Sequence, residues 1–481
     1  MKTLISILFL IIGISAFAQP PKKFYCTYGG SGYDVGYDVK QTLDGGYVIT
    51  GSTSSYGMGN TDMYLLKIDS MGQKVFQTTF GGVSNEIGKS VVQLLDSSYV
   101  MAGYTSSSGV GGYDVFLVKA DKAGNLIWQK TIGGADWDFA NSMNATADGG
   151  FIIAGTTYSY GHGNADGYVI KTDANGDTTW TKTFGGLKDD EFKSIIQTSD
   201  GNYALTGYTK SYSDSLGDGW IFKLGTLGDS LYSKSVGGAY SDVLNNVIEL
   251  PNTYLYFVGA NKSQTNGANT VNWRHVLDNL NATIVNDFIG NTHTERYNSS
   301  AISTNATIVT VGYNNYLGNS SDANIHVFTP NLGYISYNPF GVDNTDELFS
   351  VSPTKDKGFV SVGSSLGNIS LLSDILFVKT DSLGHYGVSI VGVNEHEKSN
   401  EEYSIYPNPT SDYINLKIPH YKNYNNFRYK IVDLNGRVVL SNTINEPIKT
   451  VDLVSLSDGL YFVQIYESNN LLYSSKISVI K

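Results

Sequence analysis

Glycine motifs return every 52 residues along most of this chain, seven times in succession. The first series comprises Gly30, Gly82, Gly134, Gly186, Gly238 and Gly290, and Gly341 falls one residue short of the next step. The second series comprises Gly51, Gly103, Gly155, Gly207, Gly259 and Gly363, with Gly312 one residue late. We expect no insertion or deletion in this period between Tyr28 and Val391. A fixed period of about 50 residues is typical of radial or linear repeat folds.

Each repeat holds four strand-like segments, which in the first repeat lie at 37–43, 47–53, 63–69 and 74–80. Asp44, Gly45 and Gly46 predict a hairpin turn between the first two, because both glycines allow positive φ. Four antiparallel strands in tandem repeat match a β-propeller blade. The sequence therefore predicts an all-β chain in which residues 19–391 form a seven-bladed β-propeller.

The ends of the repeat region indicate how the ring closes. Residues 24–28, followed by Gly29 and Gly30, match residues 76–80, followed by Gly81 and Gly82, so the chain opens with an outer strand that has no blade before it. Pairing of this strand with the last blade would remove an open edge, which is a liability in a sheet protein. Residues 386–391 would then be a surplus outer strand or the start of a linker.

The blade pattern resembles kelch-type repeats. A strand that ends in glycine is followed by an Asp-x-aromatic strand, a turn with glycine and a tryptophan, as in Gly103, Asp114, Phe116, Gly124 and Trp128. The single glycine at the strand end departs from the kelch pair, and the Asp-Gly-Gly-Tyr turn and Phe-Gly-Gly ending look more like the repeats of secreted bacterial and archaeal surface propellers. The resemblance covers residues 28–391 and implies an architecture without an activity.

Charge and cysteine content limit the possible partners and bonds. The net charge is −12, with acidic residues spread along the chain, so a polyanion such as DNA is repelled and nucleic acid is not an expected partner. Cys26 is the only cysteine, which leaves no disulfide within one chain.

The N-terminus has the pattern of a secretory signal peptide over residues 1–18. Lys2 precedes an apolar stretch at 4–15 and the small-x-small sequence Ala16, Phe17 and Ala18. The apolar stretch is too short to span a bilayer, and no other segment is long and apolar enough to do so. We expect an exported mature chain without a transmembrane segment.

Residues 403–481 leave the 52-residue period, after a polar linker at 392–402, and predict a small β-sandwich. They resemble the type A C-terminal sorting domain of the type IX secretion system of Bacteroidetes. The matching residues include Pro407, Asn408, Pro409, Gly436, Arg437, Gly459, Tyr461 and Lys481. The resemblance implies recognition by the outer-membrane translocon, removal by its sortase-like peptidase, and a secreted or outer-membrane surface location.

Two acidic series recur from blade to blade. The first contains Asp34, Glu86, Asp138, Asp190, Asp242 and Asp346, and the second contains Asp62, Asp114, Asp166, Asp218, Asp322 and Asp374. A residue that suits every blade is expected to hold loops by accepting backbone N–H bonds. The alternative is Ca²⁺ bound by residues such as Asp34, Asp62, Asp114 and Asp166, although no EF-hand-like loop is present. A recurring lysine, Lys67 and its equivalents, is expected to pair with a nearby acid.

Candidate ligand residues lie where the repeats differ. The 30–36 crossover and the 54–61 loop of each blade should share a face, and function on repeat scaffolds usually resides in such loops. Tyr56, Tyr158, Tyr160 and Tyr212 in these loops are candidates for stacking on sugar rings. Blades five and six break the pattern, since His275 and Val327 stand in the lysine register, and Trp273, Arg274 and His275 form a second candidate site.

Residue counts weigh against several propeller enzymes. A sialidase-like site needs three arginines on one carboxylate, and the ring contains only Arg274 and Arg296. No His-Glu-x-x-His pattern is present. The leading hypothesis is a non-catalytic module that binds a glycan or a protein. The alternatives are a polysaccharide-degrading enzyme with a carboxylate pair, or a structural surface-layer component.

Overall fold

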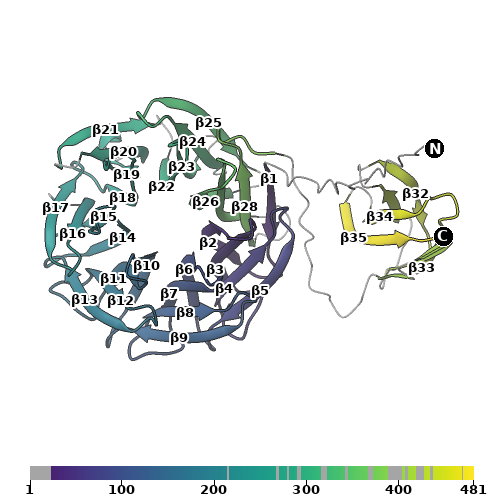
Figure 1. Ribbon diagram of the computed structural model, residues 1–481, viewed down its shortest axis with the longest axis horizontal. Helices are drawn as coiled ribbons and strands as arrows, with labels where there is room; N and C mark the ends of the chain where they lie inside the picture. The colour runs from purple at the N-terminus through teal and green to yellow at the C-terminus, as the bar shows by residue number, and fades with distance from the viewer. Residues whose placement is uncertain are drawn as a thin grey trace, which may run out of the picture. The chain divides into compact units, whose positions relative to one another are not determined.

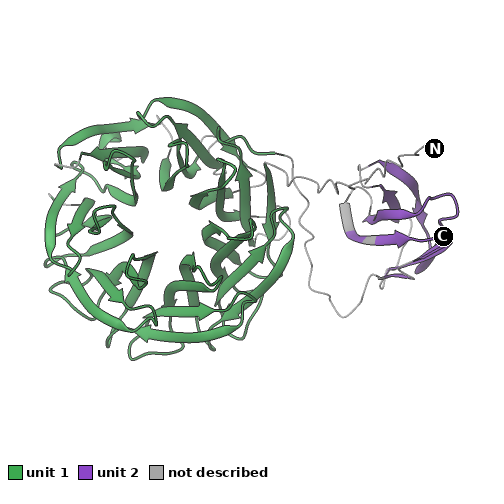
Figure 2. Ribbon diagram, in the orientation of Figure 1, with its two compact units in different colours: residues 1–392 green, residues 393–481 purple. Residues whose placement is uncertain are grey.

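The computed structural model describes residues 23–213, 216–266, 270–278, 281–289, 294–315, 322–341, 345–366, 372–387, 404–406, 410–418, 427–433, 437–467 and 470–481. The chain divides into two compact units, residues 1–392 and residues 393–481 (Figure 2).

The first unit is a closed ring of seven four-stranded antiparallel sheets, which confirms the predicted seven-bladed, all-β propeller (Figure 1). In blades one to three the strands are β2 Asp34–Gln41, β3 Tyr47–Thr53, β4 Asp62–Ile68, β5 Lys74–Phe80, β6 Glu86–Gln93, β7 Tyr99–Thr105, β8 Asp114–Ala120, β9 Leu126–Ile132, β10 Asp138–Ala145, β11 Phe151–Thr157, β12 Asp166–Thr172 and β13 Thr178–Phe184. In blades four and five they are β14 Asp190–Gln197, β15 Tyr203–Thr209, β16 Asp218–Leu224, β17 Ser230–Val236, β18 Val243–Glu249, β19 Leu255–Asn261, β20 Val271–Leu277 and β21 Thr283–Ile289, with the short 3-10 helix η1 at Ser263–Thr265. In blades six and seven they are β22 Glu295–Ile302, β23 Ile308–Asn314, β24 Asp322–Phe328, β25 Tyr334–Phe340, β26 Thr345–Pro353, β27 Phe359–Leu366 and β28 Ser373–Thr380.

The middle strands of each blade are buried on both faces because neighbouring blades pack against them. Every residue of β3 and of β4 is buried, whereas the outer strand β5 is exposed or half-buried at every residue except Phe80. The hydrophobic cores accordingly lie between blades; one of them joins Ile49 and Leu66 of blade one to Val362 and Phe377 of blade seven. This explains why the middle strands are near-continuous apolar runs in the sequence.

The N-terminal strand closes the ring, as the repeat register predicts. β1, Phe24–Tyr28, pairs antiparallel with β28, in a register that places Phe24 opposite Lys379 and Tyr28 opposite Ile375. Phe24 and Cys26 are buried in the core between blades seven and one. The predicted surplus strand at 386–391 is represented by one isolated bridge, between Tyr386 and Thr380, and residues 388–391 lie outside the described residues.

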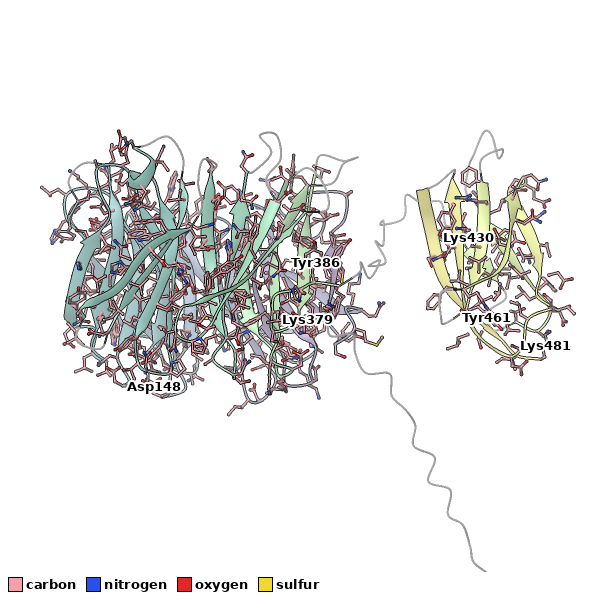
Figure 3. The ribbon with its side chains drawn as sticks, turned by 90° about the horizontal axis from the view of Figure 1, so that it is seen from above. Asp148, Lys379, Tyr386, Lys430, Tyr461 and Lys481 are labelled. Carbon is pink, nitrogen blue, oxygen red and sulfur yellow. The ribbon has the colours of Figure 1, made fainter. Side chains whose placement is uncertain are left out.

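The recurring lysine links its strand to the hairpin turn in the blades that carry it. Lys67 is buried, lies 3.1 Å from the turn residue Asp44 and donates to the carbonyl of Ile68 at 3.0 Å. Lys171 pairs with Asp148 at 2.9 Å, and Lys379 pairs with Asp356 at 3.0 Å. Figure 3, which views the ring edge-on, labels the turn residue Asp148. The predicted pairing with a nearby acid is confirmed in these blades.

The expectation of an uninterrupted period is wrong. Nine positions separate Thr53 from Asp62, but ten separate the equivalent pair, Asn261 and Val271, and eight separate Asn314 from Asp322. One extra residue in the loop of blade five is thus compensated by one fewer in the loop of blade six, so the motifs of blade seven return to phase.

This shift corrects the equivalent positions in blades five and six. Val276 stands opposite Tyr256 as Lys67 stands opposite Val48, so Val276 and not His275 replaces the lysine. Glu295 stands opposite Asn314 as Asp34 stands opposite Thr53, so blade six does carry an acid of the first series. The carboxylate of Glu295 is buried, and it accepts a hydrogen bond from the amide of Asn272 at 2.8 Å.

The second unit is a small β-sandwich, which confirms the predicted fold of this part. A three-stranded sheet, in the order β29-β30-β33, faces a four-stranded sheet, in the order β32-β31-β34-β35. The strands are β29 Ser404–Tyr406, β30 Tyr413–Lys417, β31 Phe427–Val432, β32 Val438–Ile444, β33 Ile448–Asp452, β34 Gly459–Glu467 and β35 Asn470–Val479. Their apolar side chains, among them Ile414, Leu416, Ile431, Val463 and Ile477, form one shared core.

Candidate functional site

The loops that precede the innermost strands and those that follow the second strands meet on one face of the ring, which we call the loop face. In blade one, Ser54 donates its N–H to the carbonyl of Tyr33 at 2.8 Å, and Gly32 donates to Ser55 Oγ at 2.8 Å. The sequence-based expectation that the two loops share a face is therefore confirmed.

The two acidic series hold these loops in place. Asp34 accepts hydrogen bonds from the Gly30 N–H at 2.9 Å and from Ser55 Oγ at 2.5 Å, whereas Asp62 accepts from the Gly59 N–H at 3.0 Å. Asp114 and Asp166 accept from loop N–H groups in the same way. Burial raises the pKa of Asp34, Asp62 and Asp114 above the usual range. Among the residues that the structure describes, no group of three or more His, Cys, Asp and Glu side chains has the arrangement of a metal site.

Three of the four candidate tyrosines share one structural contact. The hydroxyl groups of Tyr56, Tyr160 and Tyr212 donate to the carbonyls of Gly29, Gly133 and Gly185, at 2.9, 2.9 and 2.7 Å. Their rings pack on Tyr64, Tyr168 and Trp220, at centroid distances of 5.9, 6.0 and 5.8 Å. A contact that recurs at one position in three blades is explained by loop packing, without a ligand.

Trp273, Arg274 and His275 do not form an exposed site, which corrects the second sequence-based candidate. All three side chains are buried in β20. Trp273 Nε1 donates to Asn286 Oδ1 at 2.7 Å, Arg274 pairs with Asp287, and the guanidinium of Arg274 lies 4.1 Å from the ring centroid of Phe328 in blade six. Burial lowers the pKa of His275 to about 4. These residues brace blade five and its contact with blade six.

Tyr158, the fourth candidate tyrosine, belongs to a group of rings that the sequence analysis missed. We define the aromatic cluster as Tyr104, Tyr113, Trp137, Phe139 and Tyr158. Neighbouring ring centroids are 4.9 to 6.4 Å apart, and most pairs are edge-to-face, an arrangement that stabilises aromatic groups. Trp137 and Tyr158 are 49% and 41% exposed, and the other three rings are half-buried beneath them.

The local structure of blades two and three brings the five rings together. Tyr104 is on β7, Phe139 is on β10, and the other three residues directly adjoin β8, β10 and β11 on the loop face. A Cβ at Gly112 would lie 2.2 Å from Trp137 Nε1, so a glycine is required where the indole packs. The corresponding positions of blade one hold Ser52, Thr61, Tyr33, Val35 and Ser54. The cluster is therefore a local departure from the seven-fold repeat.

Charged side chains of blade four border the aromatic cluster. Lys210 pairs with Asp189 at 2.6 Å, and its ammonium lies 5.9 Å from the ring centroid of Tyr208. Burial raises the pKa of Tyr158, and the negative charges of Asp189 and Glu191 raise it further. Exposed rings beside fixed polar groups are the usual composition of a ligand site.

The predicted motif residues of the second unit are described in part. Tyr461 donates its hydroxyl to the carbonyl of Ser457 at 3.0 Å, and the backbone N–H of Lys481 donates to Asp458 Oδ1 at 3.0 Å (Figure 3). Arg437 contacts Asp433 at 3.2 Å, and Gly459 begins β34. Pro407, Asn408, Pro409 and Gly436 lie outside the described residues.

Comparison with known proteins identifies the second unit. Residues 404–481 match the family described as the secretion system C-terminal sorting domain. The chain thus carries a C-terminal sorting domain of the type IX secretion system, which implies a secreted or cell-surface location. Within the described residues, the structure contains no helix with the length and apolar character needed to cross a membrane.

Other relatives are more distant. Regulatory protein FlaEY of Caulobacter vibrioides is 28% identical over 212 residues, which cover 37% of this chain and 22% of that protein, so the match spans about a fifth of the relative. Among solved structures, the extracellular domain of a hybrid two-component system from B. thetaiotaomicron is 11% identical, with a TM-score of 0.44 and coverage of 94% of this chain and 58% of that one. The Neurospora crassa Pan2 WD40 domain is 11% identical, with a TM-score of 0.42 and coverage of 74% and 92%. PorZ, a surface component of the type IX secretion system of Porphyromonas gingivalis, is 13% identical, with a TM-score of 0.32 and coverage of 91% and 64%.

Proposed function

We propose that this protein is a non-catalytic surface or secreted module that binds a glycan at the aromatic cluster. The observation that carries the proposal is the exposure of Trp137 and Tyr158 on three half-buried rings, in a chain with an export domain. Large exposed rings held by packing bind flat apolar faces at little entropic cost, and the faces of pyranose rings are of this kind.

The route to the surface completes the proposal. Residues 1–18 act as a cleaved signal peptide, the sorting domain is recognised by the type IX translocon, and its sortase-like peptidase removes it. The kelch-like repeat and the type A sorting motif favour a Bacteroidetes source. Deletion of residues 403–481 should leave the propeller in the periplasm, as measured by cell fractionation, and normal surface display of that truncation would contradict this route.

Binding is tested with the purified chain that begins at Gln19 and retains both units. Retention by immobilised oligosaccharides should fall at least tenfold in Trp137→Ala and in Tyr158→Ala. Tyr33→Ala is the matched control, because Tyr33 is the blade-one counterpart of Trp137, is 57% exposed and forms no ring contact with described residues. The assay is run with Ca²⁺ and with chelator, and the products are analysed. Cleavage of the glycan, or retention only by immobilised proteins, would overturn the proposal.

A further inference from the structure

The innermost strand of each blade carries a β-bulge at the same position. The pairing register shifts between Gly36 and Asp38 in blade one, and at the equivalent place in the other six blades. A bulge leaves one residue unpaired and re-aims its side chain. The seven bulge residues, all half-exposed, are Tyr37, Lys89, Asn141, Lys193, Asn245, Asn298 and Phe349.

The three asparagines of this set have a shared structural role. Asn141 and Asn245 each donate to the backbone carbonyl of the next blade at 2.8 Å, and Asn298 does so at 2.9 Å. Lys89 of blade two and Lys193 of blade four stand where blades three, five and six have asparagine. A lysine cannot form the same bond to the next blade with the same geometry, so both depart from this structural role. Blade two also supplies part of the aromatic cluster.

Lys89 has no counter-ion within the part of the chain that the structure describes. Its ammonium lies 3.4 Å from the ring centroid of Tyr37, while Lys193 pairs with Glu191 at 2.7 Å. Burial, together with the positive charge of Lys193, lowers the pKa of Lys89 to about 8. The group is still mostly protonated at neutral pH. A cation held only by a ring face, and partly removed from water, gains when an anion reaches it.

Lys89 lies on β6, the strand that pairs with the β7 strand of the aromatic cluster. Ile87, two residues before Lys89 on β6, pairs with Tyr104 of β7, which is a member of the cluster. Phe139, another member, lies two residues before Asn141 on the same innermost strand. The carboxylates of Asp189 and Glu191 are already paired with lysines, whereas Lys89 has no acidic partner among the described residues. The negative charge of Asp136 also acts on Tyr158.

We propose that the glycan bound at the aromatic cluster is anionic, and that Lys89 pairs with its carboxylate or sulfate group. This inference rests on the proposed function. Ring stacking would fix a sugar on Trp137 and Tyr158, and its anionic substituent would extend to Lys89. The net charge of −12 opposes a long polyanion, so an oligosaccharide with few charges is the best fit.

The test is a glycan array that carries neutral, uronate, sialylated and sulfated oligosaccharides, probed with the wild-type chain and with variants. Wild type should be retained by anionic glycans at least tenfold more strongly than by neutral ones. Lys89→Met should abolish this preference, and Lys89→Arg should restore it. Lys122→Met, at an exposed turn, removes the same charge and should have no effect. Circular dichroism confirms the folding of each variant.

The outcomes separate the two proposals. The wild-type chain could retain neutral and anionic glycans equally, with retention lost in Trp137→Ala but unchanged in Lys89→Met. That result would overturn the proposal of an anionic ligand and would support glycan binding. No retention of any glycan would overturn both. Retention confined to uronate and sialylated glycans assigns the anion as carboxylate, and retention confined to sulfated glycans assigns it as sulfate; either supports the inference if it depends on Lys89.

Discussion

Asp38 of β2 accepts a hydrogen bond from the hydroxyl of Ser350 on β26, with an Oγ to Oδ1 distance of 2.7 Å, although 312 positions separate the two residues. The same carboxylate accepts from the Val91 N–H of blade two at 3.0 Å. One buried side chain therefore joins blades seven, one and two at the point where the chain closes on itself.

Replacement of Asp38 should destabilise the ring strongly. Asp38→Ala removes the acceptor of the Ser350 hydroxyl and of the Val91 N–H, both in buried surroundings, and unsatisfied buried donors are costly. We expect the free energy of unfolding to fall by about 2–4 kcal/mol. Chemical denaturation followed by circular dichroism measures it. Asp177→Ala, which breaks only an exposed ion pair with Lys130, is the control and should cost less than about 1 kcal/mol; equal losses would contradict the role of Asp38.

Glu295 should make the stability depend on pH near neutrality. Burial raises the pKa of this carboxyl to about 7 from its ordinary value of 4.5. Because the pKa of Glu295 is higher in the folded state, protonation of this carboxyl stabilises the fold. The stabilisation is complete below pH 4.5 and is lost as the pH rises through 7. Glu295→Gln mimics the protonated form, so we expect it to be more stable than wild type by about 1–3 kcal/mol at pH 8.5. Near pH 4 the two should be alike.

Thermal unfolding of the Glu295 variants at pH 4 and at pH 8.5 measures this difference. Glu295→Ala is the companion variant, because it also removes the acceptor of the Asn272 amide and should be less stable than Glu295→Gln at both values. If wild type and Glu295→Gln had the same melting temperature at pH 8.5, ionisation of Glu295 would not destabilise the fold, and the prediction would be wrong.

Asp148 should make the stability depend on pH in the opposite direction, with stability lost as the pH falls. The Thr146 hydroxyl and the Lys171 ammonium lower the pKa of this carboxyl to about 2. A lowered pKa stabilises the folded state above pH 3.8, and this contribution is lost as the pH falls from 3.8 to about 2. Asp148→Asn should therefore lower the free energy of unfolding at pH 6, and by no more than about 1 kcal/mol because the carboxylate is mostly exposed. At pH 2 the substitution should leave the free energy of unfolding unchanged. Melting temperatures at pH 6 and pH 2 provide the measurement, and Asp136→Asn, at an exposed position, is the control. An equal loss of melting temperature at both pH values would show that the charge of Asp148 is not the cause.

Removal of β1 should open the ring. A chain that begins at Gly29 lacks the partner of β28 and loses the buried side chains of Phe24 and Cys26. We expect a drop of several kcal/mol, or about 10 °C or more in melting temperature, together with aggregation through the exposed edge of β28. A chain that begins at Lys23 keeps the strand and serves as the control. Unchanged melting of the Gly29 chain would show that blade seven is stable with three strands.

The repeat made the ring and its closure predictable, because Phe24–Tyr28 copies the outer strand Lys74–Phe80 in both sequence and role. The loop change in blade five was hidden, since the compensating change in blade six restores the phase by Asp322. The sequence suggested a ligand site at Trp273, Arg274 and His275 because these residues depart from the blade repeat. They lie in a buried strand, so the departure changes the packing between strands and does not create a surface site. The aromatic cluster was missed for the opposite reason. Trp137 and Tyr104 come from different blade positions, and only the fold brings them together.

The pairing of β1 with β28 also imposes an order in time. Phe24–Tyr28 is synthesised before any blade, yet its partner strand, Ser373–Thr380, is the last of the ring to be made. Until Ser373–Thr380 is synthesised, the leading strand has no partner strand to pair with. Completion of the ring therefore requires the whole repeat region, and a chain truncated anywhere before residue 373 leaves Phe24–Tyr28 without its partner strand.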